Sequence, residues 1–275
     1  MTRQALTELI FERRSYLCVG LDAELAKLPP HLLQYEDPVL EFNKQIIDAT
    51  RDLCVAYKPN LAFYEALGAQ GWQTLEKTRT YIGQTHFAIA DAKRGDIGNT
   101  SGLYAKAFFE TLDFDAVTVA PYMGSDSVLP FLTYPGKWVI LLALTSNKGS
   151  GDFQFTPQED DQPLFVKVIE KACSWASPEQ LMFVVGATHP DAFAAVRRAA
   201  PSNFLLVPGV GAQGGDLESL SRSGLNADCG MLVNASRSIL YAGNGEDFAE
   251  KARQEALAIQ QQMDKLLDLC QFSNS

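Results

Sequence analysis

Eight short apolar runs recur along the chain, separated by segments with helical spacing, and this alternation constrains the fold more than any other feature. The runs are nearly continuous in β-branched and large aliphatic residues, which is typical of strands covered on both faces in a parallel sheet. Eight strands alternating with helices in 275 residues favour a (β/α)8 TIM barrel over an open sheet. The expected strands span 16–22, 54–60, 86–93, 114–122, 138–146, 181–188, 203–210 and 231–236.

The segments between the runs carry signals of helix starts and of one-sided packing. Asp37 followed by Pro38 predicts a helix cap and a proline at the first helical position, and similar starts are expected at Pro163 and Pro190. A stripe of apolar residues at spacings of three and four over 246–270 predicts an outer helix packed on the barrel. Because no linker or low-complexity tract interrupts the alternation, we expect residues 1–275 to form a single domain.

Composition and charge narrow the range of partners and compartments. A net charge of −10 argues against nucleic acid or an anionic membrane surface as a partner, so an anionic substrate needs positive charge concentrated locally. No apolar run reaches the roughly 18 residues of a membrane-spanning helix, and the N-terminal segment lacks the apolar core of a signal peptide. Five scattered cysteines without a C-x-x-C pair favour buried free thiols. We therefore expect a cytoplasmic protein.

One stretch, FAIADAKRGDIGNTS (87–101), runs from a buried strand directly into charges of mixed sign. Because side chains alternate along a strand, Asp91 and Lys93 are expected to point the same way, with Asp96 just past the strand end and Lys58 at the end of the strand before. A lysine beside carboxylates stays protonated and can donate a proton to a carbanion. The four charges could instead form a structural ion-pair ring at the barrel mouth, but their alternating signs at adjacent strand ends favour chemistry.

The ends of the last two expected strands predict a phosphate site. In such barrels the loops after strands 7 and 8 often bind phosphate through backbone N–H groups. The glycine-rich segment 208–216 includes Gly209 and Gly211, which let the backbone approach an anion, and Arg237 adds a guanidinium fork. These glycines do not follow the first strand of a βαβ unit, so a dinucleotide fold is not expected, and the three histidines match no metal-binding spacing.

The segment DAKRGDIGNT (91–100) resembles the D-x-K-x-x-D-I-x-x-T signature of the orotidine 5′-phosphate decarboxylase family. Segments 57–65 and 121–128 are similar to the longer subfamily called type 2, and the resemblance covers about residues 10–260. It implies decarboxylation of orotidine 5′-monophosphate to uridine 5′-monophosphate in pyrimidine biosynthesis. The resemblance also implies that the reaction uses no metal and no organic cofactor.

The resemblance further implies roles for individual residues. Lys93 is expected to protonate C6 of the pyrimidine, Asp91 to lie nearest the substrate carboxylate, and Lys58 and Asp22 to contact the ribose and order the charges. The resemblance implies that the pyrimidine of the substrate contacts Ser146, with Thr145, one register step away, as the alternative. It implies that the phosphate is bound by Gln213, Arg237, Gly209 and Gly211. Asp96 and Thr100 are expected to complete the site of a neighbouring subunit, which implies a homodimer.

Two other functions remain open on the residues. One is a metal-dependent sugar-phosphate decarboxylase or aldolase, because related barrels share D-x-K-x-x-D; such relatives are expected to carry an acidic metal ligand near the end of strand 2, where this chain has Lys58. The other is a non-catalytic barrel that binds phosphate as a sensor. The roles of Asn43, Asn60 and Asp126 are equally open between support of the site and helix capping.

Overall fold

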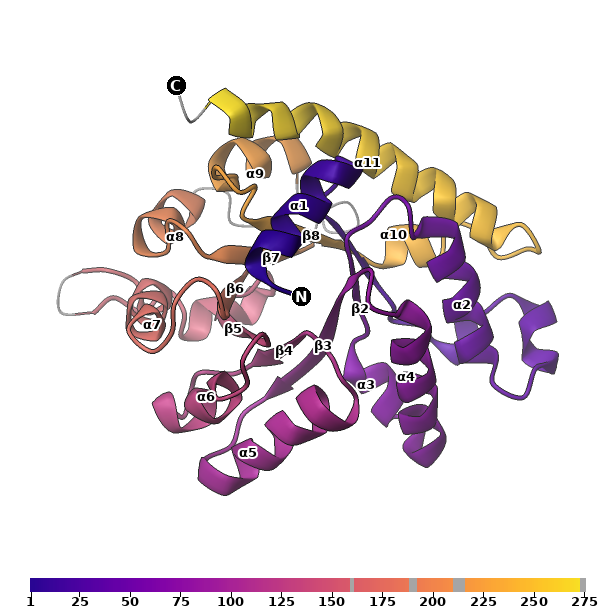
Figure 1. Cartoon of the computed structure of the whole chain (residues 1–275), viewed down its shortest axis with the longest axis horizontal. Helices are drawn as coiled ribbons and strands as arrows, with labels where there is room; N and C mark the ends of the chain where they lie inside the picture. The colour runs from indigo at the N-terminus through magenta and orange to yellow at the C-terminus, as the bar shows by residue number, and fades with distance from the viewer. Residues whose placement is uncertain (159–160, 188–191, 210–215, 273–275) are drawn as a thin grey trace.

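The strands close into a parallel barrel, as the alternation of strands and helices predicts (Figure 1). The structure is a computed structural model that describes residues 1–158, 161–187, 192–209 and 216–272, with side chains described up to residue 268. Each strand pairs in parallel with the next, and β1 pairs with β8 to complete the ring. The strands are β1 (Leu17–Gly20), β2 (Ala56–Lys58), β3 (Phe87–Arg94), β4 (Ala116–Val119), β5 (Trp138–Leu144), β6 (Leu181–Val185), β7 (Phe204–Pro208) and β8 (Met231–Ala235).

Helices surround the barrel and connect successive strands (Figure 1). The α-helices are α1 (Arg3–Arg13), α2 (Pro38–Thr50), α3 (Leu61–Glu65), α4 (Gly68–Ile82), α5 (Gly98–Lys106), α6 (Ser125–Leu132), α7 (Leu164–Cys173), α8 (Phe193–Ala199), α9 (Leu217–Gly224), α10 (Arg237–Leu240) and α11 (Phe248–Phe272). The short helices are η1 (Leu25–Lys27), η2 (Pro30–Gln34), η3 (Ala107–Thr111), which is a π-helix, and η4 (Lys148–Asp152).

The hydrogen-bonded strands are mostly shorter than the apolar runs that predict them. The run 114–122 contains a strand only over Ala116–Val119, because the chain leaves the ladder and turns into the loops at the barrel mouth. Burial continues beyond the ladder, as at Leu21, which is why hydrophobicity alone predicts too long a strand. β3 is the exception, since it extends one residue past its predicted end, to Arg94.

Aromatic side chains close the N-terminal end of the barrel. Phe87, Trp138 and Phe204 come from alternate strands and meet edge to face, with ring centroids 5.9 and 6.3 Å apart. The Trp138 indole donates a hydrogen bond of 2.9 Å to the carbonyl of Met1, whose terminal ammonium lies 2.6 Å from Asp115. Figure 1 shows α1 lying across this end of the barrel. The opposite end therefore remains for a cavity.

The helix signals in the sequence are confirmed where the structure describes them. Pro38 is the first residue of α2, and the Asp37 carboxylate accepts a hydrogen bond of 3.1 Å from the Leu40 amide. α7 begins directly after Pro163, whereas Pro190 lies outside the described residues.

The final helix packs on the outside of the barrel, as its apolar stripe predicts. Phe248, Ala252, Ala256 and Met263 are fully buried, and Phe248 stacks on Phe42 of α2 with ring centroids 5.1 Å apart. Near the end of α11, Leu267 is fully buried and the adjacent Leu266 is partly buried against the core. In the described residues, no helix is long and apolar enough to span a membrane.

Candidate active site

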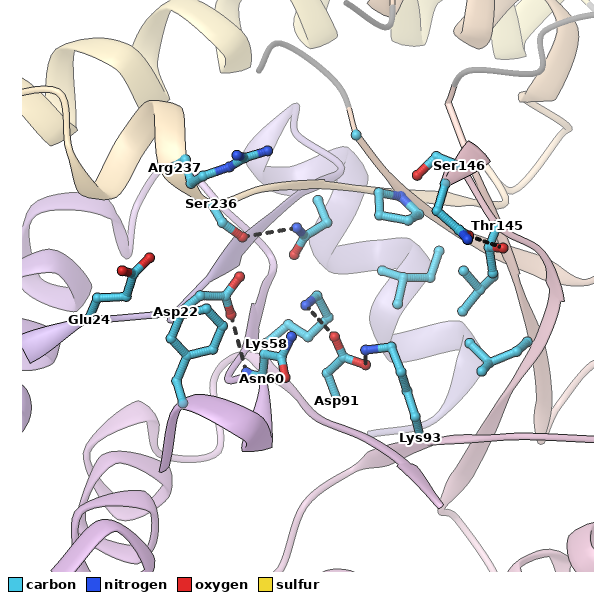
Figure 2. A pocket seen from close by; sticks show the side chains of 18 of the residues that line it. Asp22, Glu24, Lys58, Asn60, Asp91, Lys93, Thr145, Ser146, Ser236 and Arg237 are labelled. Atoms are coloured by element: carbon cyan, nitrogen blue, oxygen red, sulfur yellow. Dashed lines mark hydrogen bonds and ion pairs between the residues drawn. The ribbon is translucent and has the colours of Figure 1, made fainter. Parts of the chain in front are cut away.

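A cavity of about 540 Å³ opens at the C-terminal ends of the strands, where the barrel fold predicts a site (Figure 2). Its lining combines apolar side chains with polar residues singled out in the sequence. Its lining comprises Asp22, Glu24, Lys27, Lys58, Asn60, Phe63, Asp91, Lys93, Leu142, Thr145, Ser146, Asn147, Val184, Leu206, Pro208, Gly209, Asn234, Ser236 and Arg237.

Three of the four charges form a continuous cation–carboxylate–cation array in this cavity. The Lys58 ammonium donates to Asp91 Oδ2 at 2.9 Å, and the Lys93 ammonium donates to Asp91 Oδ1 at 2.7 Å. The Lys58 and Asp91 side chains are only 6% and 10% exposed, whereas the Lys93 side chain is 49% exposed. The array therefore has a buried, fixed half and one lysine that reaches the open cavity.

The charge states of the buried half follow from its surroundings. Burial opposes the ionised form of Asp91, but the charges of Lys58 and Lys93 and their hydrogen bonds outweigh it, so the pKa of Asp91 lies well below its ordinary value. Burial likewise opposes the charged form of Lys58, yet Asp91 and Asp22 raise the pKa of Lys58 above its ordinary value. Asp91 is thus an anion and Lys58 a cation across the physiological pH range.

The backbone of Lys93 is left-handed, with φ of +47°, which is uncommon for a residue other than glycine. The register between β3 and β4 shifts between Ala90 and Arg94, so the regular ladder is interrupted at this point. The Lys93 amide instead donates 2.8 Å to the Thr118 hydroxyl of β4, which in turn donates 2.9 Å to Asp91 Oδ1. Sequence reasoning missed Thr118, because an isolated threonine in an apolar strand gives no signal.

Asp22 and Asn60 connect the array to the neighbouring strand ends. Asp22 Oδ1 accepts a hydrogen bond of 3.2 Å from the Asn60 amide, and the Asn60 side chain caps α3 by accepting 3.2 Å from the Ala62 amide. Asn60 is therefore both a helix cap and a wall of the cavity. Asn43 lies outside the cavity, fully buried, and donates to the hydroxyls of Tyr64 and Thr78, so it supports the helices behind the site.

Thr145 and Ser146 both line the cavity, but Thr145 is held from behind. Gln154 accepts 2.8 Å from the Thr145 amide and donates 2.8 Å to its hydroxyl, which in turn donates 2.6 Å to Asn147. The amide and the hydroxyl of Thr145 are thus both engaged by protein atoms. A Cβ at position 186 would lie 2.6 Å from the Ser146 amide, so Gly186 permits the close approach that places Ser146 at the mouth. Sequence reasoning missed Gln154, which lies inside a long irregular loop.

The expected phosphate end lies across the cavity from Ser146 (Figure 2). Arg237 opens α10 with an exposed side chain, and Gly209, with φ of +99°, also belongs to the cavity lining. The Asn234 amide donates 3.1 Å to the Ser236 hydroxyl and orders the end of β8. Gly211 and Gln213 lie outside the described residues.

Asp96, the fourth charge, and Thr100 are not in the lining of the cavity. Asp96 is half-buried and its carboxylate accepts 2.8 Å from the Ile97 amide, while Thr100 is exposed on α5. Asp126 is exposed in the first turn of α6, where a carboxylate suits the helix dipole. In the part of the chain that the structure describes, no group of three histidine, cysteine, aspartate or glutamate side chains is placed to hold a metal ion.

A buried ion pair continued by an exposed lysine in a cavity at the C-terminal mouth of a β/α barrel is the arrangement of a barrel enzyme rather than of a structural surface. Residues 15–252 match the model of the orotidine 5'-phosphate decarboxylase / HUMPS family, and the chain belongs to this family. The resemblance inferred from the 91–100 motif is thereby confirmed for the family.

Individual relatives agree with this assignment. The chain is 58% identical over 270 residues to an orotidine 5'-phosphate decarboxylase of Phocaeicola vulgatus, covering 97% of this chain and 99% of the relative. Among solved structures, a Leishmania donovani OMP decarboxylase shares 40% identity with a TM-score of 0.79, covering 94% of this chain and 99% of the other. A Leishmania donovani UMP synthase shares 42% identity with a TM-score of 0.79 and covers 92% of this chain, which spans 56% of that longer chain.

Proposed function

We propose that this chain decarboxylates orotidine 5′-monophosphate to uridine 5′-monophosphate and carbon dioxide in pyrimidine biosynthesis. Membership of the family and the names of the relatives support the reaction. The observation that carries the proposal is the Lys58–Asp91–Lys93 array facing the cavity. At the end of β2, where the rival metal-dependent barrels are expected to place an acidic ligand, the chain places the Lys58 cation.

The two ends of the cavity suggest how the nucleotide binds. The phosphate lies against Arg237 and the backbone at Gly209, and the pyrimidine reaches Ser146 on the opposite wall (Figure 2). This orientation places the carboxylate at C6 beside Asp91. Because Asp91 is held as an anion, it repels the substrate carboxylate, and the binding energy of the remote phosphate offsets that repulsion.

The chemistry then consists of one bond cleavage and one proton transfer. The bond between C6 and the carboxylate breaks, carbon dioxide leaves, and the electron pair stays on C6 as a carbanion. The Lys93 ammonium stabilises that charge and donates its proton to C6, giving the product. Lys93 regains a proton from solvent, to which its side chain is 49% exposed. Lys58 keeps Asp91 ionised and fixed throughout.

The experiment that tests this function follows the orotate chromophore when the purified protein meets orotidine 5′-monophosphate, with a chelator present and no metal added. Loss of the chromophore with formation of uridine 5′-monophosphate is the expected result. Loss of activity in chelator, restored by a divalent metal, would favour the metal-dependent rival. Tight binding of uridine 5′-monophosphate without turnover would favour the sensor.

We also propose that the active form is a homodimer in which Asp96 and Thr100 complete the site of the second copy. Both residues lie outside the cavity of their own chain, at the start of a surface that carries exposed apolar side chains. That surface, on α5, α6 and the loops before them, includes Ile97, Leu103, Tyr122, Met123 and Leu129, which are 43–94% exposed. Because α5 and α6 pack side by side, several exposed apolar side chains gather on neighbouring elements, which is typical of a protein interface.

Mixing two inactive variants tests the shared site. Asp96→Ala and Lys93→Ala are each expected to lose turnover. When the two variants are mixed and allowed to exchange subunits, part of the activity should return. In each mixed dimer, one of the two sites combines an intact Lys93 with an intact Asp96 from the other copy. A mixture that stays inactive despite confirmed subunit exchange would contradict the shared site.

The cytoplasmic location stays a prediction, supported by the four described cysteines, which are all free thiols.

A further inference from the structure

Thr118 of β4 is the one uncharged side chain that joins two members of the catalytic array, as far as the described residues show. Its hydroxyl lies 2.9 Å from Asp91 Oδ1 and 2.8 Å from the Lys93 amide nitrogen. The residue is 1% exposed and is not part of the cavity lining. Thr118 therefore contacts the array from behind rather than from the cavity.

The two hydrogen bonds of Thr118 have only one possible arrangement. The Lys93 backbone amide can only donate, so the Thr118 oxygen accepts from it. An ionised carboxylate can only accept, so the single hydroxyl proton points to Asp91. Lys93 is therefore linked to Asp91 twice, once through its own ammonium and once through its backbone and Thr118.

The link through the backbone explains why Lys93 keeps its left-handed conformation. A non-glycine residue in this region is strained and persists only where the surroundings hold it. The ladder between β3 and β4 is interrupted at this point, and the Thr118 hydroxyl takes the place of a strand partner for the Lys93 amide. Without it, the backbone is free to relax and to move the ammonium away from Asp91.

We propose that Thr118 is a positioning residue for the decarboxylation, holding the Lys93 ammonium and the Asp91 carboxylate at the separation that the reacting carbon requires. This role rests on the proposed function of the same cavity. When Lys93 has given up its proton, Asp91 keeps two donors, Lys58 on Oδ2 and Thr118 on Oδ1, so the carboxylate stays in place for the next turnover.

Three substitutions at this position separate the hydroxyl from the packing. Thr118→Val removes the hydroxyl and keeps the shape, Thr118→Ala removes both the hydroxyl and the methyl group, and Thr118→Ser keeps the hydroxyl. We expect kcat to fall about 10- to 100-fold in the Val and Ala variants, as the loss of a hydrogen bond to a charged group implies. KM should stay within about threefold, because the side chain does not line the cavity. Thr118→Ser should keep kcat within about threefold.

A matched control is available in α4. Thr74 is fully buried and its hydroxyl also lies 2.7 Å from a carboxylate, that of Asp37, but neither residue lines the cavity. Thr74→Val should lower the melting temperature while leaving kcat unchanged. A similar loss of kcat in the control would show that the effect of Thr118 comes from general destabilisation, and would overturn the proposal.

The wild-type assay separates this inference from the function on which it rests. If the wild-type protein does not decarboxylate the nucleotide, the proposed function fails and the role of Thr118 falls with it. If the wild type is active and Thr118→Val or Thr118→Ala matches its kcat, only the positioning role is overturned. If Thr118→Ser loses as much activity as Thr118→Val, the methyl group rather than the hydroxyl matters, and the proposal is again overturned. Should the Val variant not fold, the Ala variant decides.

Discussion

Lys93 lies two residues after Asp91 on β3, and its ammonium returns to within 2.7 Å of Asp91 Oδ1 although the Lys93 backbone is left-handed. An extended strand would also place the two side chains on one face, but it would not require the unusual φ of +47°. Backbone strain of this kind is concentrated at functional sites. The pair therefore combines a position that periodicity predicts with a conformation that the tertiary structure imposes.

Removal of the Lys93 ammonium should abolish turnover and spare binding. In Lys93→Ala the carbanion at C6 has neither its nearest cation nor its proton donor, so we expect kcat to fall by about 10³-fold or more. Uridine 5′-monophosphate should still bind, because the phosphate contacts at the opposite end are intact. The measurement is the initial rate of chromophore loss together with calorimetric binding of the product. Lys137→Ala, which removes a lysine outside the cavity lining, is the control, and near-normal turnover in Lys93→Ala would contradict the mechanism.

Arg237→Ala should instead weaken binding. Arg237 lies at the end of the cavity opposite Ser146, so its loss should raise KM about 10- to 100-fold, in line with a charge-assisted hydrogen bond. Exposed Arg222, which pairs with Glu218 on the surface of α9, offers a control substitution with the same change of net charge. Equal effects on KM in Arg237→Ala and Arg222→Ala would show that Arg237 has no specific contact with the phosphate.

Gln154→Ala should impair recognition of the pyrimidine through Thr145. Gln154 makes two hydrogen bonds of 2.8 Å to Thr145, and their loss frees the end of β5 where Ser146 lines the cavity. Two neutral hydrogen bonds correspond to roughly 1–3 kcal/mol, so we expect kcat/KM to fall about 5- to 100-fold. Gln158→Ala in the same loop is the control, because the half-buried side chain of Gln158 lies outside the cavity lining and donates a long hydrogen bond of 3.3 Å to the Thr156 carbonyl. Unchanged kcat/KM in Gln154→Ala would show that the loop does not position Ser146.

The local pattern of the sequence was enough to predict the barrel and the buried charges, but not the contacts that cross between strands. The alternation of strands and helices predicts eight parallel strands, and strand periodicity predicts that Asp91 and Lys93 share a face. The role of Thr118 depends on a register shift between β3 and β4, 25 residues apart in the sequence, and no local pattern encodes it. The ends of strands are similarly set by where the ladder closes rather than by hydrophobicity.

Asp96 illustrates a second limit of local reasoning. Its spacing after Lys93 suggests that it belongs to the same array, yet in this chain its carboxylate turns to the Ile97 amide, outside the cavity lining. A strand period does not extend into a loop, so the direction of a side chain beyond the strand end depends on the loop and on any second copy of the chain. The sequence alone leaves the role of Asn43 undecided for a related reason, since its partners Tyr64 and Thr78 come from helices elsewhere in the chain. Asn60 caps the helix that follows it directly, but its amide contact with Asp22 joins residues 38 positions apart.

Asp91→Asn should destabilise the fold because it leaves buried Lys58 without its counter-ion. Breaking a buried ion pair in this way lowers the free energy of unfolding by about 3–5 kcal/mol. The double variant Asp91→Asn/Lys58→Met should recover part of that loss, because it also removes the unpaired buried cation. Folding lowers the pKa of Asp91, so its contribution to the free energy of unfolding is fully present above about pH 3.8 and is lost as the pH falls further. Folding raises the pKa of Lys58, so its contribution is fully present below about pH 10.5. The stability difference measured by urea unfolding should therefore be constant between roughly pH 5 and 9. A single variant as stable as the wild type would contradict this account.

His86, buried before β3 at the N-terminal end of the barrel, should make the protein less stable as pH falls. The pKa of His86 is lowered from 6.5 to about 4, mainly because the imidazole is buried. The hydrogen bond to the Arg51 carbonyl raises this pKa, and the positive charges of Arg13 and Arg51 lower it further. Above pH 6.5, His86 is neutral in both the folded and the unfolded protein and contributes no pH dependence. Between pH 6.5 and about 4, only the unfolded chain takes up the proton. The free energy of unfolding therefore falls by about 1.4 kcal/mol for each pH unit of acidification. Urea unfolding at several pH values should show this slope in the wild type and in the control His31→Gln, and a shallower slope in His86→Gln. An unchanged slope in His86→Gln would mean that His86 is protonated in the folded protein, and that burial does not hold it neutral.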